Sequence, residues 1–295
     1  MDTKRDVGID LHVHSKASDG SASSIEILNS AQKLGIGAIA LTDHDSVEGV
    51  REVLQNGVPP GIKFLTGIEI SASPPEEFPC SGSFHMLGYG IRVNDTEFNE
   101  TLEKLRQARK TRNPRIIERL NRMGIDLSLE EVETIAGGAQ TGRPHIAKAM
   151  VAKGFASSIN DAFDRYIGKG RPAYVEKYRL DSAAAIEMIL KAGGIPVLAH
   201  PVLIKPVDDR PIDSLIHILK SMGLRGIEVY YPEHSEQLTD FYARLATRYG
   251  LLMTGGTDYH GSLKPDIELG CGRGDFFVPF RLYEQLVRET GCNHG

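Results

Sequence analysis

The hydrophobic and polar positions at the start of the chain alternate with the period of a β-strand. Apolar residues stand at every second position, at Val7, Ile9, Leu11 and Val13. Three of the polar residues on the alternate positions are Asp10, His12 and His14. Because the side chains of a strand point alternately to its two faces, these three share one face. The pattern predicts a first strand that presents two imidazoles and a carboxylate together.

The next segment changes to the period of a helix. Ser23 and Glu26 form a capping box at its start, the apolar residues that follow recur at helical spacing, and Gly35 fits its C-terminal cap. Three further strands are then predicted, in residues 36–45, 62–71 and 84–91.

A long helical stretch interrupts the strands. Helical periods run through residues 98–124, 128–138, 143–154 and 159–168. We expect the first of these helices to be interrupted or restarted at Pro114, and Pro144 to stand in the first turn of the third. Strand and helix patterns alternate again from residue 182 to residue 261. We therefore predict an α/β fold whose parallel sheet belongs to residues 1–95 and 186–295, with an all-helical insertion over residues 96–185.

Charge distinguishes the insertion from the rest of the chain. The 295 residues carry a net charge of −5, but residues 96–180 contain 16 Lys and Arg against 11 Asp and Glu, a net of +5. The remainder carries 18 against 28, a net of −10. A basic segment in an acidic body indicates contact with an anionic molecule, and a solvated helical surface is the alternative.

Composition is that of an ordinary globular protein, 41% hydrophobic and 25% charged. No apolar stretch has the length of a membrane span, and the first residues do not resemble a signal peptide. The three cysteines, Cys80, Cys271 and Cys292, form no CxxC motif. We expect a reduced, cytoplasmic protein that does not contact a membrane.

Residues that bind transition metals recur at the ends of the predicted strands. The nine candidates are His12, His14, Asp19, His44, Glu69, His85, His200, Asp258 and His260. Most follow a strand, whereas His85 opens one. The C-terminal ends of barrel strands form the active-site face of α/β barrels, so these residues are expected to converge. Since one ion needs about four to six ligands, nine candidates predict two or three ions, and mixed imidazole and carboxylate ligands favour Mn, Fe or Zn. His217 and His294 are interpreted as structural.

Together, the Asp-x-His-x-His strand, the segments TDHD, GIEIS, AHP and GTDYHG and the isolated His85 resemble the PHP (polymerase and histidinol phosphatase) family. The insertion carrying GRPHIAKAM is similar to that of one branch of the family. The resemblance covers residues 7–95 and 190–262 as well as the insertion. It implies a distorted (β/α)7 TIM-like barrel with three metal sites.

The resemblance also implies which residues hold each ion. The first ion would be held by His12, His14, Glu69 and Asp258, the second by Glu69, His85 and His200, and the third by Asp19, His44 and His260. Many members of the family have a histidine at the position of Asp19. We assign catalysis to Glu69, Asp258 and His200, and expect Asp10, Asp43 and Asp45 to orient the imidazoles.

The similar branch comprises phosphoesterases that act on nucleoside 3′,5′-bisphosphates, 5′-mononucleotides and short 5′-phosphorylated RNA. Adjacent cations lower the pKa of a bridging water, which gives a hydroxide nucleophile, and they neutralise phosphoryl oxygens in the transition state. Arg143 and His145 in the insertion, and His234 after a later strand, are expected to bind the substrate and its phosphate.

Other functions remain open from the sequence. They are a histidinol phosphate phosphatase, a PHP module of a DNA polymerase, an amidohydrolase-like metal hydrolase and a non-catalytic binding protein. The Arg143–His145 insertion is not expected in the first, no polymerase sequence accompanies the second, and no lysine stands at a strand end as amidohydrolases usually require. We expect a small phosphorylated substrate, a nucleotide or short RNA, and no protein partner.

Overall fold

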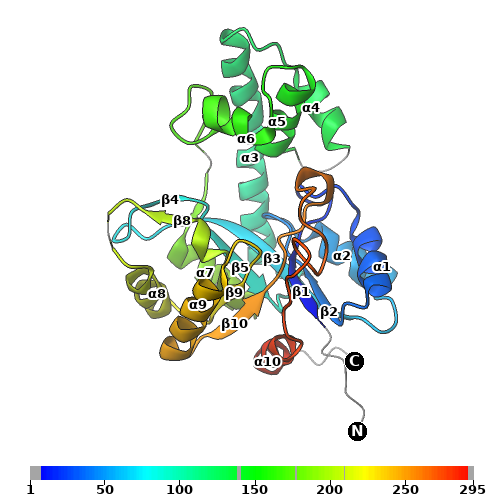
Figure 1. Ribbon diagram of the computed structural model, residues 1–295, viewed down its shortest axis with the longest axis vertical. Coiled ribbons are helices and arrows are strands. Elements are labelled where there is room, and N and C mark those ends of the chain that lie inside the picture. Colours follow the sequence, from blue (N-terminus) through cyan, green and yellow to red (C-terminus); the bar gives the residue numbers. More distant parts are fainter. Residues whose placement is uncertain (1–7, 138–140, 177, 209, 292–295) are drawn as a thin grey trace.

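The computed structural model describes residues 8–137, 141–176, 178–208 and 210–291. Val7, Cys292 and His294 lie outside the described residues. The central sheet is nearly closed into a barrel (Figure 1), as predicted. Its strands, in spatial order, are β1 (Ile9–Val13), β2 (Ala38–Leu41), β3 (Lys63–Ser73), β5 (His85–Tyr89), β7 (Ile195–Leu198), β9 (Gly226–Tyr230) and β10 (Leu252–Gly255).

Strand direction departs from a regular parallel barrel at one place. β5 pairs antiparallel with both of its neighbours, β3 and β7. The other pairs along the barrel are parallel. The first and last strands meet beyond their ends, where the His14 N–H donates to the Tyr259 carbonyl at 2.9 Å and the Asp258 N–H donates to the His12 carbonyl at 2.8 Å. These bonds bring the segments after β1 and β10 side by side.

Helices cover the outside of the barrel and one of its ends. They are α1 (Ser24–Leu34), α2 (Glu48–Asn56), α7 (Ser182–Lys191), α8 (Ile212–Ser221), α9 (Glu236–Tyr249) and α10 (Arg281–Thr290). The capping box and Gly35 cap predicted for α1 are both present. α10 lies under the barrel (Figure 1), where Leu282 and Leu286 join the buried side chains of the barrel interior, such as Leu11 and Val197. That end is therefore closed by packed apolar side chains.

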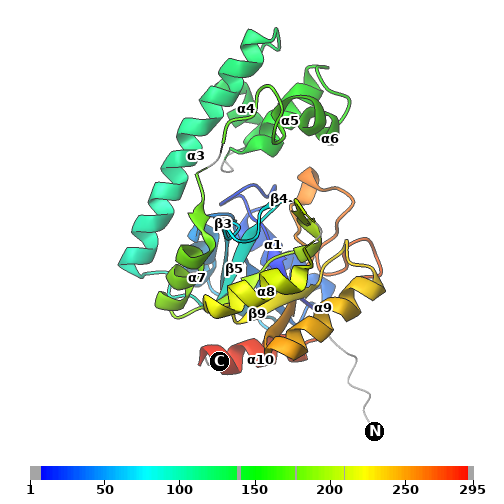
Figure 2. The ribbon, with the colours of Figure 1, turned by 90° about the vertical axis from the view of Figure 1, so that its left-hand side faces the viewer.

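The insertion has a hydrophobic core of its own. Its helices are α3 (Thr96–Arg122), α4 (Leu129–Ala136), α5 (Arg143–Ala152), α6 (Ile159–Ala162) and the π-helical turn η1 (Phe163–Ile167). The core extends from Ile116 to Val175 in sequence. In both ribbon views, α4, α5 and α6 stand above the open end of the barrel, and α3 runs from them down beside the barrel (Figures 1 and 2). The boundaries of the two domains stay a prediction.

α3 is a single helix that runs through Pro114, so an interruption there is not observed. Phe98, Leu102 and Leu105 pack in the barrel core, whereas Ile116 and Leu120 pack in the core of the insertion. The proline removes one backbone hydrogen bond, and hydrophobic packing on both sides of it offsets that cost. α3 therefore joins the two cores as one element.

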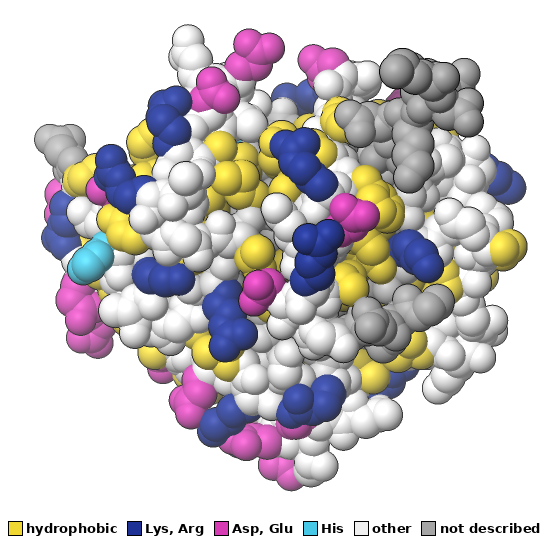
Figure 3. Space-filling view, turned by 90° about the horizontal axis from the view of Figure 1, so that it is seen from below, with side chains coloured by type: hydrophobic (Ala, Val, Ile, Leu, Met, Phe, Trp, Pro, Cys, Tyr) yellow, Lys and Arg dark blue, Asp and Glu magenta, His cyan; other side chains and the backbone are white. Residues whose placement is uncertain are grey.

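Shorter elements complete the fold. β4 (Cys80–Gly82) pairs with β8 (Ile204–Pro206), and β6 (Leu180–Asp181) extends the edge of β3. The 3-10 turns η2 (Pro201–Leu203) and η3 (Gly261–Leu263) follow β7 and β10. No helix among the described residues is long and apolar enough to cross a membrane. On the face below the barrel, acidic and basic side chains are interspersed (Figure 3).

Candidate metal centre and active-site cavity

The backbone at the open end of the barrel takes up an unusual conformation at three residues. Asp45, His200 and Asp258 have positive φ angles of 53°, 25° and 56°, and they are the non-glycine residues of the described chain with this conformation. Such backbone conformations cost free energy and persist where the surrounding structure enforces them, often at functional sites. All three lie in loops that follow β2, β7 and β10.

His85 reaches this end of the barrel because β5 is reversed. The residue opens β5, whereas His12 lies next to the last residue of β1 and Glu69 lies in the second half of β3. In an antiparallel strand, the N-terminal end lies beside the C-terminal ends of its neighbours. His85 therefore meets Ser71 of β3, two residues beyond Glu69, in the register of the sheet.

Glu69 lies at the centre of the cluster and is buried. Its Oε1 is 2.8 Å from His85 Nδ1 and 2.9 Å from His200 Nε2. Its Oε2 is 2.9 Å from His44 Nδ1 and 3.2 Å from His14 Nε2. His12 Nε2 follows at 3.5 Å from Oε2. One carboxylate therefore faces five imidazoles, and each of its oxygens serves a different side of the cluster.

The ligand-type atoms form three overlapping groups, each lying within 4.8 Å. The groups are His12, His14, Glu69 and Asp258; His44, Glu69 and His85; and His14, Asp19, His44 and His260. The first equals the set expected for the first ion. The other two also contain most of the residues expected together, with His44 beside Glu69 and His14 beside Asp19. His200 joins the second through its contacts with Glu69 and His85.

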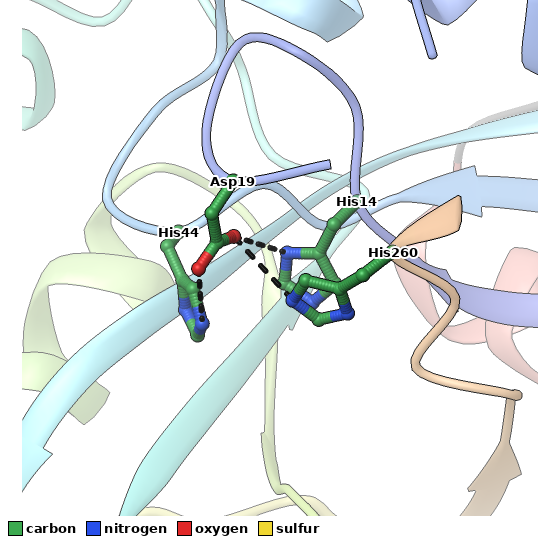
Figure 4. Close-up of side chains that lie close together, drawn as sticks. All are labelled: His14, Asp19, His44 and His260. Carbon is green, nitrogen blue, oxygen red and sulfur yellow. Dashed lines mark ion pairs between the residues drawn. The ribbon is translucent and has the colours of Figure 1, made fainter. Parts of the chain in front are cut away.

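Asp19 reaches back over the third group from the loop after β1. Figure 4 shows its carboxylate pointing toward the rings of His14, His44 and His260. Its Oδ1 lies 3.4 Å from His260 Nε2 and 3.8 Å from His14 Nδ1, and its Oδ2 lies 3.9 Å from His44 Nε2. At these distances, the carboxylate oxygens and ring nitrogens surround a common point and do not form tight pairs.

Several buried atoms of the cluster make no hydrogen bond among the described residues. They are His12 Nε2, His14 Nε2, His44 Nδ1, His200 Nδ1, Asp19 Oδ1 and Glu69 Oε2. Buried polar atoms without partners are costly, and a bound cation would satisfy those whose lone pairs face it. Imidazole nitrogens with carboxylate oxygens are also the donor set of transition metals. The residues present therefore fit a group of metal ions.

A buried glutamate that the sequence analysis did not single out supports two ligands. The His12 Nδ1–H donates to Glu228 Oε1 at 2.9 Å, and the backbone N–H of His200 donates to Glu228 Oε2 at 2.6 Å. Because the Nδ1–H of His12 is engaged, its Nε2 faces Glu69 and Asp258. Glu228 thus orients one imidazole directly and holds the strained backbone of another.

The three aspartates expected to orient imidazoles accept hydrogen bonds from residues that stand within two positions of candidate ligands in the sequence. Asp10 accepts hydrogen bonds from the N–H and hydroxyl of Thr257, beside Asp258. Asp45 accepts from the N–H and hydroxyl of Ser71. Asp43 accepts from Ser18 Oγ at 2.7 Å, and that hydroxyl lies 3.5 Å from His14 Nδ1. Their influence on the rings therefore passes through neighbouring groups.

Charge in the cluster shifts the protonation of its members in opposite directions. Burial opposes ionisation of Glu69, but the surrounding imidazoles, His44 foremost, outweigh burial and hold its pKa well below the usual range. Burial likewise lowers the pKa of His14, but Asp258 and Glu69 raise it to about 9. Burial lowers the pKa of His260 to about 4. Without ions, the cluster therefore holds protons between its carboxylates.

A cavity of about 270 Å³ lies between the cluster and the insertion. Cluster residues on its floor include Asp19, His44, Glu69, His85, His200, Asp258 and His260. On the insertion side it is lined by Arg112, Asn113, Arg143, Phe163 and Arg179. The acidic and imidazole floor thus faces three guanidinium groups, in contrast to the mixed charges of Figure 3.

Arg143 stands at the start of α5 and is held by aromatic rings. Its guanidinium carbon lies 5.2 Å from the ring centre of Phe163 and 5.7 Å from that of Tyr174. Its Nη1 donates to the Ile167 carbonyl at 3.2 Å. Arg112 is held similarly. Its Nε donates to the Val175 carbonyl at 2.8 Å, and its guanidinium carbon lies 5.7 Å from the ring centre of Tyr174. Cation–π contacts of this kind restrict the guanidinium groups while keeping them at the cavity.

Two predicted substrate-binding residues do not line this cavity. His145 is buried, and its Nδ1 accepts a hydrogen bond from the N–H of Gly142 at the start of its own helix. The ring of His234 binds the Val229 carbonyl at 2.7 Å and lies between the rings of Tyr231 and Tyr242. A direct contact of either with a substrate stays a prediction.

The match to a known family now agrees with this geometry. The model of the PHP domain family matches residues 10–193. The chain belongs to the PHP domain family. The α/β barrel fold expected from the motifs is therefore confirmed.

Proteins with assigned functions are similar over most of the PHP chain. A 5′-3′ exoribonuclease of Haemophilus influenzae is 31% identical, covering 85% of this chain and 89% of its own. A 3′,5′-nucleoside bisphosphate phosphatase of Chromobacterium violaceum is 30% identical, covering 85% and 87%. The structure of a Bifidobacterium adolescentis protein assigned as a metal-dependent phosphoesterase has a TM-score of 0.83 and 27% identity, covering 97% of both chains. The expected class of enzyme, a metal-dependent phosphoesterase, is confirmed at this level.

Several residues of the PHP site were absent from the sequence prediction. They are Arg112, Arg179, Glu228, Tyr231 and Lys264. A glutamate between Ile227 and Val229, in an otherwise apolar strand, is the one clear signal, because buried carboxylates are rare without a partner. Lys264 follows a turn rather than a strand, so the pattern of strand ends does not indicate it.

Proposed function

We propose that this chain removes phosphate from nucleotides: nucleoside 3′,5′-bisphosphates, 5′-mononucleotides or short 5′-phosphorylated RNA. The observation that supports this most is the composition of the cavity, where a metal-type cluster faces Arg112, Arg143 and Arg179. A phosphomonoester is small and anionic, and its oxygens match both the ions of the floor and guanidinium groups. The names of the relatives support a nucleotide as the remainder of the substrate.

We propose two to three divalent ions, of Mn, Fe or Zn, held by the nine residues of the cluster. Glu69 would bridge the first and second ions, because its two oxygens face different imidazoles. Asp19, His44 and His260, with His14 beside them, would hold the third. When bound, such ions acidify water and neutralise phosphoryl oxygens.

The side chains of this chain would then orient the substrate. Glu69, Asp258 and His200 lie at the floor of the cavity, where they would border the reacting ester. Arg143 would bind a phosphate from above, with its position set by Phe163 and Tyr174. Because the cavity meets both domains, the insertion would select among esters that the barrel alone treats alike.

A substrate comparison tests the proposal. The protein reconstituted with Mn is offered a nucleoside 3′,5′-bisphosphate, 5′-mononucleotides, 5′-phosphorylated short RNA and histidinol phosphate, and released phosphate or nucleotide is measured. We expect the highest kcat/KM on a nucleotide substrate. A preference for histidinol phosphate would assign the chain to the alternative phosphatase, and no hydrolysis of any ester would contradict the proposal.

We also propose where this enzyme is located and what it binds. Cys80 and Cys271 are free thiols, which agrees with a reduced, cytoplasmic location. The cavity would bind a small phosphorylated molecule, and the proposal requires no second protein.

A further inference from the structure

Lys264 brings a positive charge to the cavity from the barrel side. It follows the turn η3, four residues after His260, and it lines the same cavity as Arg143. Its Nζ lies 2.5 Å from Asp258 Oδ2. Its side chain is 39% exposed, whereas that of Asp258 is 8% exposed. The ammonium therefore stands at the boundary between the buried cluster and the open cavity.

The backbone around Lys264 holds this position. The Ser262 N–H donates to Ser21 Oγ at 2.8 Å, and the Lys264 N–H donates to the Gly261 carbonyl at 3.0 Å. The Ile267 N–H in turn donates to the Lys264 carbonyl at 3.0 Å. Both sides of the residue are therefore anchored, so that its side chain is presented to the cavity by a fixed turn.

The two oxygens of Asp258 have separate partners. Oδ1 faces the imidazoles of His12, His14 and His260 at 3.5, 3.2 and 3.4 Å. Oδ2 accepts from Tyr231 at 3.1 Å and from Lys264. Tyr231 is buried, so its hydroxyl serves the carboxylate alone, whereas Lys264 also borders the cavity. An ammonium has three N–H donors, and the contact with Asp258 uses one of them.

We propose that Lys264 binds the phosphoryl group that is transferred, from the side of the cavity opposite the insertion. The inference rests on the proposed function and adds a phosphate ligand to it. A phosphoryl group on the floor would meet the ions below and Lys264 at its side, and Arg143 on the insertion side would remain for a second phosphate. Lysine suits this position because a compact ammonium can bind Asp258 and a phosphate oxygen at once. Charge-assisted bonds of this kind stabilise the extra negative charge of the transition state.

Phosphate binding separates this role from a structural one. Inorganic phosphate is titrated calorimetrically into Mn-reconstituted wild type, Lys264→Met and Lys264→Arg, with Mn content measured in each. Lys33→Met, at an exposed lysine of α1, is the matched control. We expect Lys264→Met to weaken phosphate binding about 10- to 100-fold with Mn content unchanged. Lys264→Arg should retain most of the affinity, and Lys33→Met should bind as wild type does.

Kinetics locate the contact at the reacting phosphate. Lys264→Met should lower kcat/KM by the same factor for p-nitrophenyl phosphate and for a nucleoside 3′,5′-bisphosphate. Wild-type phosphate affinity in Lys264→Met would overturn the inference, as would a loss of Mn in Lys264→Met. A loss confined to the bisphosphate would overturn it as well. If wild type itself neither binds phosphate nor hydrolyses an ester, the proposed function fails instead.

Discussion

At the scale of the residue, the unusual feature of Glu69 is the number of imidazole rings around its one carboxylate. Five imidazoles lie within 3.5 Å of its oxygens. Its charge can therefore stabilise two ions at once, and a neutral side chain of the same shape cannot. Residue type and strand position predicted Glu69 and the other eight cluster residues. They could not predict Glu228, since a carboxylate on a strand acquires its role from the neighbours that the fold supplies.

We expect Glu69→Gln to abolish turnover while the fold is retained. An amide removes the negative charge between the first two ions but keeps the side-chain volume. The measurements are kcat on a nucleotide substrate, Mn content and the circular dichroism spectrum. Glu187→Gln, at an exposed glutamate of α7 that pairs with Lys191, is the matched control. More than about a tenth of wild-type kcat, equal to about 1.4 kcal/mol of barrier, would argue against a bridging role.

The raised pKa of His14 predicts that metal affinity depends on pH. Although burial lowers it, Asp258 and Glu69 raise the pKa to about 9, so the ring is protonated at pH 7 in the metal-free protein. An ion must displace that proton, and affinity should therefore rise with pH, by about tenfold per unit for each proton displaced. Calorimetry of Mn binding at pH 6, 7 and 8, in buffers with different ionisation enthalpies, gives both affinity and proton release. The same affinity at all three values, with no proton release, would contradict this protonation state.

At the scale of the element, the strand pattern predicted β1, β2, β3 and β5 but not the direction of β5. Alternation of side chains is the same in parallel and antiparallel strands, so direction depends on pairing that distant residues establish. In the sequence, this reversal is indicated by the position of His85 at the start of its strand. Proline chemistry similarly could not show that α3 continues through Pro114, because the two cores that hold it form only in the folded chain.

The closure of the barrel predicts that Gly256 cannot carry a side chain. A methyl group there would lie against the backbone nitrogen of His12 and within 2.5 Å of its Cβ. Gly256→Ala should therefore push the Asp258 segment away from β1, costing about 1–3 kcal/mol of unfolding free energy. Denaturant unfolding and Mn content measure the two effects. A variant that is as stable as wild type and loads the same Mn would show that the two segments can separate without loss.

At the scale of the whole molecule, the cavity lies between the barrel and the insertion, whose two hydrophobic cores are joined by α3. The barrel contributes the cluster and Lys264, and the insertion contributes Arg112, Arg143 and Arg179. The net charge of +5 in residues 96–180 indicated an anionic partner, and the cavity shows where three of those cations gather. Arg143 was expected at the site from its motif, but Arg112 and Arg179 could not be predicted, since helical periodicity does not say how one domain sits on another.

Arg143→Ala should impair substrates with a second phosphate more than simple aryl phosphates. The loss of a charge-assisted bidentate contact costs about 1.5–3 kcal/mol, or about 10- to 150-fold in kcat/KM. Mn content should not change, because Arg143 is not in the cluster. The measurement is kcat/KM for a nucleoside 3′,5′-bisphosphate and for p-nitrophenyl phosphate. Arg165→Ala, at an exposed arginine of the same insertion, is the control. Equal losses on both substrates would place Arg143 at the transferred phosphate alone, and no loss on either would remove it from the site.

The central claim is that the cluster holds the ions on which nucleotide hydrolysis depends. Its most direct test is phosphate release from a nucleoside 3′,5′-bisphosphate by one preparation, before chelation, after chelation and after Mn is restored. Metal content is determined at each stage. We expect activity that disappears with the metal and returns when at least two ions per chain are bound. Activity that survives complete removal of metal, or that never appears with the cluster filled, would contradict it.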